Sequence, residues 1–567
     1  MCVSLFASVL LLASSYGSAE DTMNYTFTVC GVKHHFENKT IDWSFNPTYN
    51  GYKEWPWQFA RMRFLPNLAA YYEKTGDEKA AETFVALVTS FIDGAPPPPF
   101  ESRPGATKSW RTLDTGLRAT SWIGSYFAFT NSPALTPAFR AKFRRSLDDH
   151  VRRLEKPMTS NNWRIMELRG LVDILLAFPD IERADEIRAS AERELADVLN
   201  KQLYPDGFHF ELSTGYHTIL DGDFAALASC YRRFGRKPPD FLEKGIELAF
   251  ELYPHLTRPD RILPKLNDSG TVPIVPKMKT AARLFPHRRD FLWFATNGRD
   301  GEKPPYLSYA FPYSGAVVFR TSWDRDAVWG YVDMSPFGRG HQHEDKLNFL
   351  LFAYGKEMLC EGGNYAYDAS DMRKYVVSTR AHNTVRIDGK DQNARKFWKW
   401  TDDKLREKAD FSFTTTPARD VAASTFSFGY GRGEDWSGAV RHTRTVEFVK
   451  DAQDGRPYFR ITDDLVSSDD QIHAYEQLWH LETCELDLSA DRFTADFGDG
   501  VTLEAAFKSE NGRLVDLIGT TEPELQGWMP ILPAGPHEHR PIHTPTLKGA
   551  FTGKAKLVAV FRPVRAR

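Results

Sequence analysis

A change of apolar period near residue 305 is the feature that most constrains how this chain folds. Up to about residue 300, apolar residues such as Phe84, Val88 and Phe91 recur at helical spacing, and short Pro- and Gly-rich breaks separate the segments. After about residue 310, stretches such as "SGAVVFRTSWDRDAVWGYVDM" read as strand, polar turn, strand. The sequence therefore predicts paired antiparallel helices, as an array or a toroid, over 20–300. Antiparallel sheets packed as a sandwich are expected over 301–567, with the boundary in 297–306.

The length of the chain supports a multidomain α+β fold, and its charge bears on the partners to expect. The chain has 567 residues, more than one ordinary core accommodates. Its net charge of -3 gives no reason to expect a nucleic acid or an anionic membrane surface as partner. No run of 18 apolar residues follows the N-terminal region, so membrane insertion is not expected.

The N-terminal residues resemble an export signal. The apolar stretch from Val3 to Ala13 is too short to span a bilayer, and small residues lead to a plausible cut before Glu20. Residues 1–19 are therefore predicted to be a signal peptide, and the protein to be periplasmic or secreted.

Four cysteines lie beyond this predicted signal: Cys30, Cys230, Cys360 and Cys484. They are scattered and show no C-x-x-C spacing. A disulfide remains open in an oxidising compartment, but domains of this size do not need one, so free buried thiols are favoured.

A histidine-rich stretch opens the β half. In "GHQHEDKLNFLLFAYGKEMLCEGG", His341 and His343 alternate before an apolar strand, and Glu361 follows that strand. With His382, two imidazoles and a carboxylate (His343, Glu361 and His382) would make a common zinc ligand set if neighbouring strands bring them together. The alternative is a group of hydrogen-bonded histidines under a loop, and spacing alone does not decide between them.

Two stretches of the helical half have a structural and a functional interpretation. In "MTSNNWRIMELRG", the Asn pair before a helix is either a cap or an amide donor aimed at a substrate carboxylate. In "DGFHFELSTGYHTILDG", Tyr216 is either a packed aromatic or an acid–base group that needs a neighbouring cation or donor.

Taken together, these stretches resemble the heparinase II/III-like polysaccharide lyases. The resemblance begins with "EWPWQFARMRFLPNLAAYYEKTGD" and "SWRTLDTGLRATSW". It continues through "NNWR", "DGFHFELSTGYH", "PKLNDSG", "GHQHEDKLNFLLFAYGKEML", "YVVSTRAHNTV" and "YEQLWHLE". It implies an N-terminal incomplete (α/α) toroid and a C-terminal antiparallel β-sandwich. The chain is most similar to the heparinase III, or heparin-sulfate lyase, branch.

The resemblance also implies roles for individual residues. Asn162 matches the Asn that neutralises a uronate carboxylate, and Tyr216 and His341 match the catalytic Tyr and His. The family's metal-binding or site-supporting positions match His343, Glu361 and His382, and they imply one structural divalent ion, zinc rather than calcium. Glu361 replaces an Asp that is common there, and Trp163 stands where some branches have a His.

The resemblance implies that the protein cleaves a uronic-acid polysaccharide by β-elimination. The expected substrate is heparan sulfate or heparin. Alginate or another uronan is the alternative substrate, and an inactive glycan-binding homologue is the alternative function. A glycoside hydrolase would need a carboxylate pair, for which Glu167, Glu211 and Asp268 remain open. Trp163 and Arg164 are predicted substrate contacts; for Arg164 and Arg169 the alternative is an ordinary solvated helix face.

Overall fold

A computed structural model describes residues 16–48, 51–160, 162–393, 395, 399–531 and 538–566. The chain divides into two compact units. The first contains the chain up to Gln202 together with Ile219–Glu247, and the second contains Leu203–Thr218 and Leu248–Arg567. The short segment that carries Tyr216 therefore belongs to the same unit as His341.

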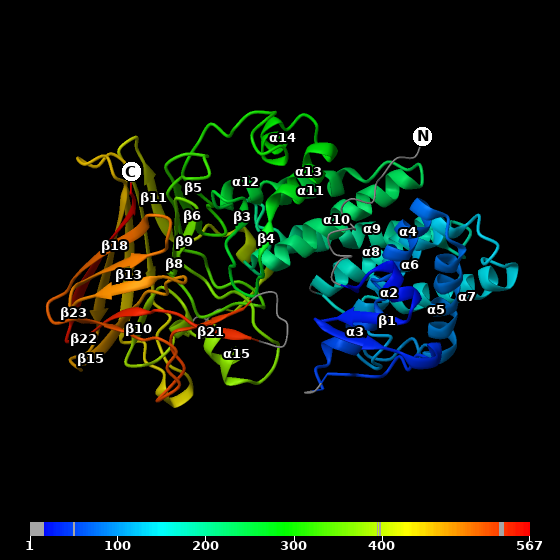
Figure 1. Cartoon of the computed structure of the whole chain (residues 1–567), viewed down its shortest axis with the longest axis horizontal. Coiled ribbons are helices and arrows are strands. Elements are labelled where there is room, and N and C mark those ends of the chain that lie inside the picture. Colours follow the sequence, from blue (N-terminus) through cyan, green and yellow to red (C-terminus); the bar gives the residue numbers. More distant parts are fainter. Residues whose placement is uncertain are drawn as a thin grey trace. The chain divides into compact units, whose positions relative to one another are not determined.

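The first unit is helical, as the apolar period predicts (Figure 1). Its helices are α2 (Ala19–Met23), α3 (Glu54–Ala60), α4 (Leu65–Thr75), α5 (Glu78–Gly94), α6 (Thr112–Tyr126), α7 (Pro137–Leu154), α8 (Asn162–Ala177) and α9 (Ala184–Gln202), with most of α10 (Thr214–Arg233) and α11 (Asp240–Phe250). A hairpin of β1 (Thr26–Val29) and β2 (Val32–His35) precedes them. The predicted cut before Glu20 falls within α2, whose N-cap is Ser18.

Local signals explain where these helices start and stop. Gly76 ends α4 in the left-handed conformation, and the Asp77 side chain then caps α5 by accepting from the Lys79 backbone.

Two glycines let α6 and α8 approach closely. A Cβ on Gly116 would overlap the backbone at Met166, and one on Gly170 would overlap Gly116. This contact fixes α8, whose first turn carries Asn162.

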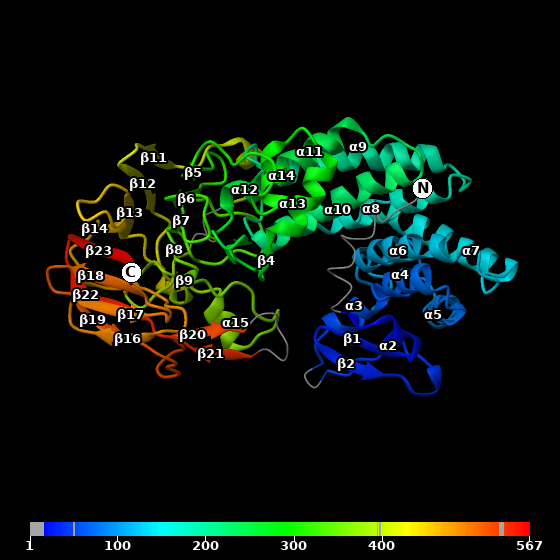
Figure 2. The same cartoon turned by 45° about the horizontal axis from the view of Figure 1, so that its top comes forward.

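The second unit contains three main antiparallel sheets, which confirms the predicted β half (Figures 1 and 2). The eight-stranded sheet has the order β11 (Phe411–Thr415), β12 (Arg419–Phe426), β13 (Val440–Val449), β14 (Tyr458–Ser467), β23 (Lys554–Arg565), β18 (Val501–Lys508), β17 (Arg492–Asp496), β16 (Glu485–Leu488). The four-stranded sheet is β10 (Val385–Ile387), β15 (His473–Leu478), β22 (Pro545–Phe551), β19 (Arg513–Asp516). The five-stranded sheet is β5 (Tyr309–Ala310), β6 (Ala316–Arg320), β7 (Trp329–Asp333), β8 (Phe349–Ala353), β9 (Lys356–Leu359).

These sheets share one apolar core. Phe459 of the eight-stranded sheet packs edge-on against Phe319 and Phe349 of the five-stranded sheet. Next to the four-stranded sheet, Trp479 contacts Phe561 of the eight-stranded sheet. Strands β6, β7 and β8 have five residues each, and all of these residues are buried, because sheets or loops cover both faces of the strands.

Shorter elements complete the second unit. They are α12 (Leu252–Leu256), β3 (Ile262–Leu263), β4 (Val272–Pro273), α13 (Ile274–Leu284), α14 (Arg289–Ala295), α15 (Asp371–Val376), β20 (Trp528–Pro530) and β21 (His539–Pro541). Loops joining β7 to β8 and β9 to α15, together with the segment before α10, carry the polar residues considered below.

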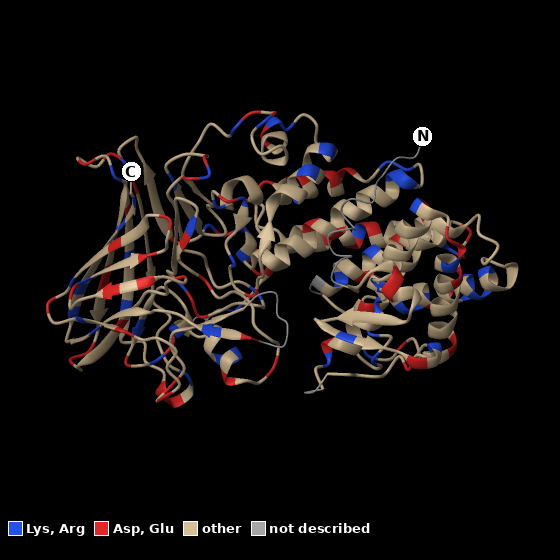
Figure 3. Ribbon diagram, viewed as in Figure 1, with Lys and Arg blue, Asp and Glu red and all other residues tan. Residues whose placement is uncertain are grey.

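Cys30, Cys230, Cys360 and Cys484 are all free thiols, as predicted, although only Cys360 is fully buried. Positively and negatively charged residues are interspersed along the ribbon of both units (Figure 3). Within the described ranges, every helix is too short or too polar to cross a bilayer.

Candidate active site

Tyr216 and His341, the two catalytic residues that the resemblance implies in the second unit, lie against each other. Their rings are stacked, with centroids 3.6 Å apart and planes inclined by 17°. Tyr216 is in the first turn of α10, and His341 is in the loop between β7 and β8. Two residues far apart in the sequence therefore form one pair.

The backbone at His341 is held in an uncommon conformation. His341 has a φ of 46° and follows Gly340, which has a φ of 71°. For a residue with a Cβ, this left-handed region is sparsely populated and persists only where its surroundings impose it. Two hydrogen bonds do so here: the Asp268 amide donates to the His341 carbonyl at 3.2 Å, and the His343 amide donates to Asn267 Oδ1 at 2.8 Å.

A buried carboxylate lies behind His341. Glu211 Oε2 is 3.1 Å from His341 Nδ1, and the Glu211 side chain is 5% exposed. Burial raises the pKa of Glu211, and His341 opposes that rise. A carboxylate at this distance favours a proton on Nδ1, which leaves Nε2 free to accept one.

The hydroxyl of Tyr216 has a defined partner. It lies 2.9 Å from the hydroxyl of Tyr367, which belongs to the loop between β9 and α15. Arg373 of α15 lies with its guanidinium carbon 5.1 Å from the centre of the Tyr367 ring. The phenol that is predicted to transfer a proton therefore lies beside a second phenol and near a fixed cation.

Asp268 ties this arrangement to the histidine-rich strand region. Its carboxylate receives two hydrogen bonds from Arg373, at 2.6 and 2.8 Å, and one from His343 Nε2 at 3.0 Å. Burial alone would raise the pKa of Asp268, but the hydrogen bonds from His343 and Arg373 hold it well below its usual range. Asp268 is therefore a charged anchor for both residues.

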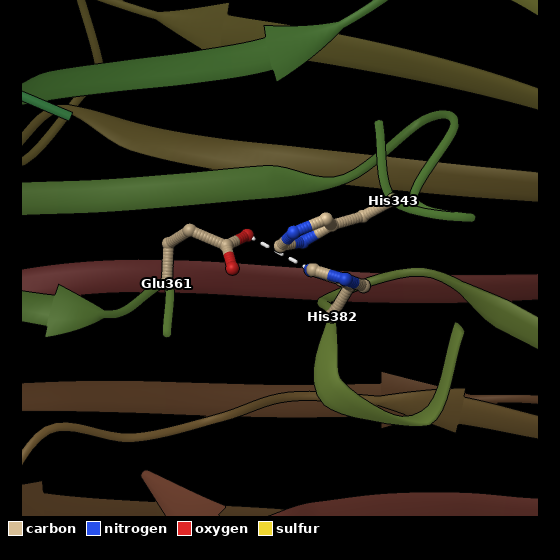
Figure 4. Close-up of side chains that lie close together, drawn as sticks. All are labelled: His343, Glu361 and His382. Atoms are coloured by element: carbon tan, nitrogen blue, oxygen red, sulfur yellow. Dashed lines mark hydrogen bonds and ion pairs between the residues drawn. The ribbon is translucent and has the colours of Figure 1, made fainter. Parts of the chain in front are cut away.

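His343, Glu361 and His382 converge, as the predicted ligand set requires (Figure 4). One ligand atom from each lies within 4.8 Å of the other two, and all three side chains are buried. Glu361 Oε2 is 2.9 Å from His382 Nδ1 and also accepts from Asn348 Nδ2 at 2.7 Å. Burial alone would lower the pKa of His382, but the Glu361 carboxylate outweighs it and raises this pKa.

Two buried nitrogen atoms of this triad, one from each histidine, are available to bind a metal ion. Among the described residues, no hydrogen-bond partner reaches His343 Nδ1 or His382 Nε2, although both atoms are buried. The second nitrogen of His343 is fixed by Asp268, an arrangement common for metal-binding histidines. Two imidazoles and a carboxylate with unpartnered nitrogens fit a divalent ion that accepts nitrogen and oxygen ligands.

The predicted residues of α8 lie in the other unit. Asn162 is the first residue of α8, but its side chain, like all of Asn161, lies outside the described residues, so its role stays a prediction. Trp163 is half-buried and packs on a small apolar cluster with Leu113, Leu117 and Met166. The guanidinium carbon of Arg111 lies 4.7 Å from its ring centre.

Arg164 and Arg169 are both held in ion pairs within the helical unit. The Arg164 side chain is 1% exposed and pairs with Glu194 at 2.6 Å and with Glu167 at 3.3 Å. Arg169 forms ion pairs with Asp173 and Asp223. These contacts give both residues a packing role and do not support substrate binding by Arg164.

The carboxylates considered for a glycosidase are also committed elsewhere. Glu167 is buried against Arg164, Asp268 is bound by Arg373 and His343, and Glu211 lies against His341. Within the second unit, Glu211 therefore contacts a histidine, and Asp268 contacts a histidine and an arginine. These contacts fit supporting roles and not the acid and nucleophile of a hydrolase.

Sequence reasoning missed Tyr367 and Arg373, and it left Glu211 open as a glycosidase carboxylate without pairing it with His341. Tyr367 stands in the glycine-containing segment "EGGNYAYDAS", where no spacing or motif distinguishes it from its neighbour Tyr365. No sequence pattern pairs Glu211 with His341, because their contact depends on how two loops meet.

Comparisons with known proteins identify relatives of both halves of the chain. The profile of the heparinase II/III N-terminus matches residues 10–293, and the profile of the heparinase II/III-like C-terminal region matches residues 303–530. A heparin-sulfate lyase of Pedobacter heparinus is 28% identical over 62% of this chain and 54% of its own length. A heparin-sulfate lyase of Bacteroides stercoris is 25% identical over 79% of this chain and 68% of its own.

The fold has the same relatives. The crystal structure of a heparan sulfate lyase mutant from Pedobacter heparinus superposes with a TM-score of 0.72 at 21% identity, covering 100% of this chain and 84% of that one. The alignment to the Pedobacter heparin-sulfate lyase spans only about half of that relative's length. Two profiles that together cover most of the sequence nevertheless define the membership: the chain belongs to the heparinase II/III family.

Proposed function

We propose that this protein is a polysaccharide lyase that cleaves a uronic-acid polysaccharide by β-elimination. The observation that carries the proposal is the stacked pair of Tyr216 and His341, with Glu211 behind the imidazole and Tyr367 on the phenol. An imidazole fixed by a carboxylate and a positioned phenol are the acid and base that such an elimination needs.

The chemistry follows from these positions. A base removes the weakly acidic proton at C5 of the uronate, which builds negative charge on the carboxylate, and the bond from C4 to the departing oxygen breaks. His341 Nε2 is the proposed base, and the Tyr216 hydroxyl gives its proton to the departing oxygen. The C5 proton on His341 balances the proton lost by Tyr216, and no water is consumed. Asn162 is proposed to donate to the uronate carboxylate, where a hydrogen-bond donor lowers the cost of the developing charge.

Heparan sulfate or a less sulfated glycosaminoglycan is the proposed substrate class. Support comes from three curated relatives, each of which is named a heparin-sulfate lyase. The chain's own residues support the reaction more directly than the choice of polysaccharide, because the predicted guanidinium contact, Arg164, is occupied by Glu194 and Glu167.

Ultraviolet absorbance tests the proposal directly. Elimination leaves a double bond conjugated to the uronate carboxylate, whereas hydrolysis leaves none. The purified protein is incubated with heparan sulfate, heparin, chondroitin sulfate, hyaluronan and alginate in parallel. Absorbance that rises with heparan sulfate, and is lost in Tyr216→Phe, supports the proposal. Reducing ends produced without absorbance would identify a hydrolase, and no cleavage of any polymer would favour an inactive glycan-binding protein.

We further propose that His343, Glu361 and His382 hold one structural divalent ion, with zinc favoured over calcium because two ligands are imidazoles. When bound, such an ion would neutralise the buried Glu361 and tie together the segments that follow β9 and precede β10. His343 lies two residues beyond His341, so the same ligand set would also steady the loop that presents His341.

Metal analysis and stability measurements test the ion without relying on activity. Protein purified without added metal is analysed by elemental mass spectrometry, and its melting temperature is compared before and after chelation. About one zinc per chain and a lowered melting temperature after chelation are expected. His382→Ala should bind no zinc. A metal-free protein whose melting temperature is unchanged by zinc and by chelator would show that the triad is a hydrogen-bonded pair plus a histidine.

Export to the periplasm or the exterior is also proposed, on the apolar stretch from Val3 to Ala13, which lies outside the described residues. N-terminal sequencing of protein recovered from the periplasmic and extracellular fractions tests it. A mature protein beginning near Glu20 is expected, and recovery of uncleaved chain only from the cytoplasm would contradict it.

A further inference from the structure

Tyr367 stands apart from the other tyrosines of its segment. Tyr365 and Tyr375 are 7% and 1% exposed and pack in one apolar cluster with Met372 and Val376. Tyr367 keeps 43% of its surface exposed, yet its hydroxyl lies 2.9 Å from that of Tyr216. Packing therefore does not explain this ring, whereas its polar end has a specific partner.

The loop that carries Tyr367 is fixed at several points. The Asn364 amide donates to the Ser269 carbonyl at 2.9 Å, and a Cβ on Gly363, whose φ is 64°, would overlap that same carbonyl. Arg373 lies over the Tyr367 ring while both of its terminal nitrogens bind Asp268. These contacts fix the direction of Tyr367 independently of any packing of its own side chain.

Resting on the proposed lyase function, we propose that Tyr367 is a positioning residue, which donates its hydroxyl hydrogen to the oxygen of Tyr216 and so aims the proton of Tyr216 at the departing oxygen of the substrate. A phenol hydroxyl carries one hydrogen and accepts through its lone pairs. When Tyr367 donates to Tyr216, the hydrogen of Tyr216 remains available for the substrate.

The same hydrogen bond acts on the charge that appears during the reaction. When Tyr216 gives up its proton, a phenolate remains, and a hydrogen bond donated to a charged oxygen stabilises it more than one donated to a neutral oxygen. Tyr367 keeps its own hydrogen throughout, so the proton balance is unchanged: the departing oxygen gains the proton of Tyr216, and His341 holds the one from C5. The benefit is thus expected in kcat and not in substrate binding.

Tyr367→Phe tests this inference, because only the hydroxyl is lost. Loss of a hydrogen bond to a charged oxygen should lower kcat about 10-fold or more, while KM and the melting temperature stay unchanged. The matched control is Tyr365→Phe, which removes a hydroxyl from the same loop and should leave kcat within about 2-fold of the parent, as expected away from the reacting groups.

A double variant separates positioning from direct action. Because Tyr367 acts through the oxygen of Tyr216, adding Tyr367→Phe to Tyr216→Phe should cause no further loss of kcat. Unchanged kcat in Tyr367→Phe would overturn the inference, as would an equal loss in both backgrounds or a rise in KM alone, since each shows that Tyr367 does not act through Tyr216. A parent protein that forms no unsaturated product from any polymer would instead refute the proposed function, and this inference with it.

Discussion

Two polar clusters of the second unit use similar residue types in opposite ways. One consists of His442, Arg444, Asp463 and Gln477 and lies in the sandwich core; the other consists of Glu211, Tyr216, His341 and Tyr367. In the first, each oxygen of Asp463 accepts two hydrogen bonds, all at 2.7 Å. In the second, the His341 side chain is 26% exposed and Tyr367 is 43% exposed.

The difference separates a structural cluster from the one proposed to act on a substrate. The remaining Arg444 nitrogen donates to the carbonyls of Leu347 and Asn383 at 2.6 Å, so the guanidinium joins three segments of the core. Burial alone would raise the pKa of Asp463, but Arg444 and His442 hold it well below its usual range. A carboxylate with four donors has nothing left for a substrate, whereas the tyrosine–histidine pair keeps polar atoms that a ligand can reach.

The largest effect is expected from breaking the structural cluster. Arg444→Met leaves Asp463 charged, buried and without its main partner, which should lower the free energy of unfolding by about 3 to 5 kcal/mol. Urea unfolding followed by circular dichroism measures this change. Arg441→Met, on the exposed face of the same strand, is the control and should change stability by less than about 0.5 kcal/mol. Equal losses in the two variants would show that the cluster contributes no more than an exposed arginine.

The opposite pattern is expected for the cluster proposed to act on a substrate. Tyr216→Phe keeps the ring stacked on His341 and removes the proton donor, so turnover should fall about 10²-fold or more while the melting temperature stays unchanged. His341→Ala should lower turnover similarly if its imidazole is the base. Formation of unsaturated product by Tyr216→Phe at the parent rate would contradict the assignment. Full activity in His341→Ala would make Tyr216 both base and acid.

The sequence predicted the fold and the convergence of His343, Glu361 and His382 better than the surroundings of Tyr216 and His341. Apolar period defined both halves, because it records which faces of helices and strands are buried. His343, Glu361 and His382 were predictable because strand alternation and the short return after β8 bring them close. Tyr367, Arg373 and the pairing of Glu211 with His341 depend on loops, whose course follows from many weak contacts and leaves no period in the sequence.

Arg164 shows the same limit in the helical unit. Its position beside Asn162 suggested either a substrate contact or a solvated face, and the structure instead buries it between Glu194 and Glu167. The partners lie on a different helix and one turn along the same helix, respectively. Helical spacing predicts the second contact, whereas the first requires knowing which helix packs against α8.

A smaller loss of activity is expected when the carboxylate behind His341 is neutralised. Glu211→Gln keeps the size of the side chain but removes the charge that lies 3.1 Å from His341 Nδ1, so kcat should fall about 10-fold, as for loss of one close charge interaction. Substrate binding should be unaffected, so KM is expected to stay constant. Steady-state kinetics on the best polymer measure both. Glu211→Asp, which retains the charge, should recover part of kcat; equal losses in the two variants would indicate that the size of Glu211, and not its charge, supports His341.

The smallest effect is expected from a third polar cluster, at the surface of the four-stranded sheet. His473 lies between Asp388, at 2.8 Å from Nδ1, and Asp469, at 2.9 Å from Nε2. Burial alone would lower the pKa of His473, but the two carboxylates outweigh it and raise this pKa. A histidine whose pKa is raised by folding stabilises the folded state fully below its unfolded value of about 6.5, and this contribution is lost as the pH rises through the folded value.

The parent should therefore be more stable than His473→Gln by up to about 1 kcal/mol at pH 5.5, and the difference should shrink toward pH 8.5. Urea unfolding of both proteins across this range measures the trend, and 1 M salt should weaken it because the carboxylates are partly exposed. A stability difference that grows with pH would show that His473 is neutral in the folded protein and that its two carboxylates do not act as charged partners.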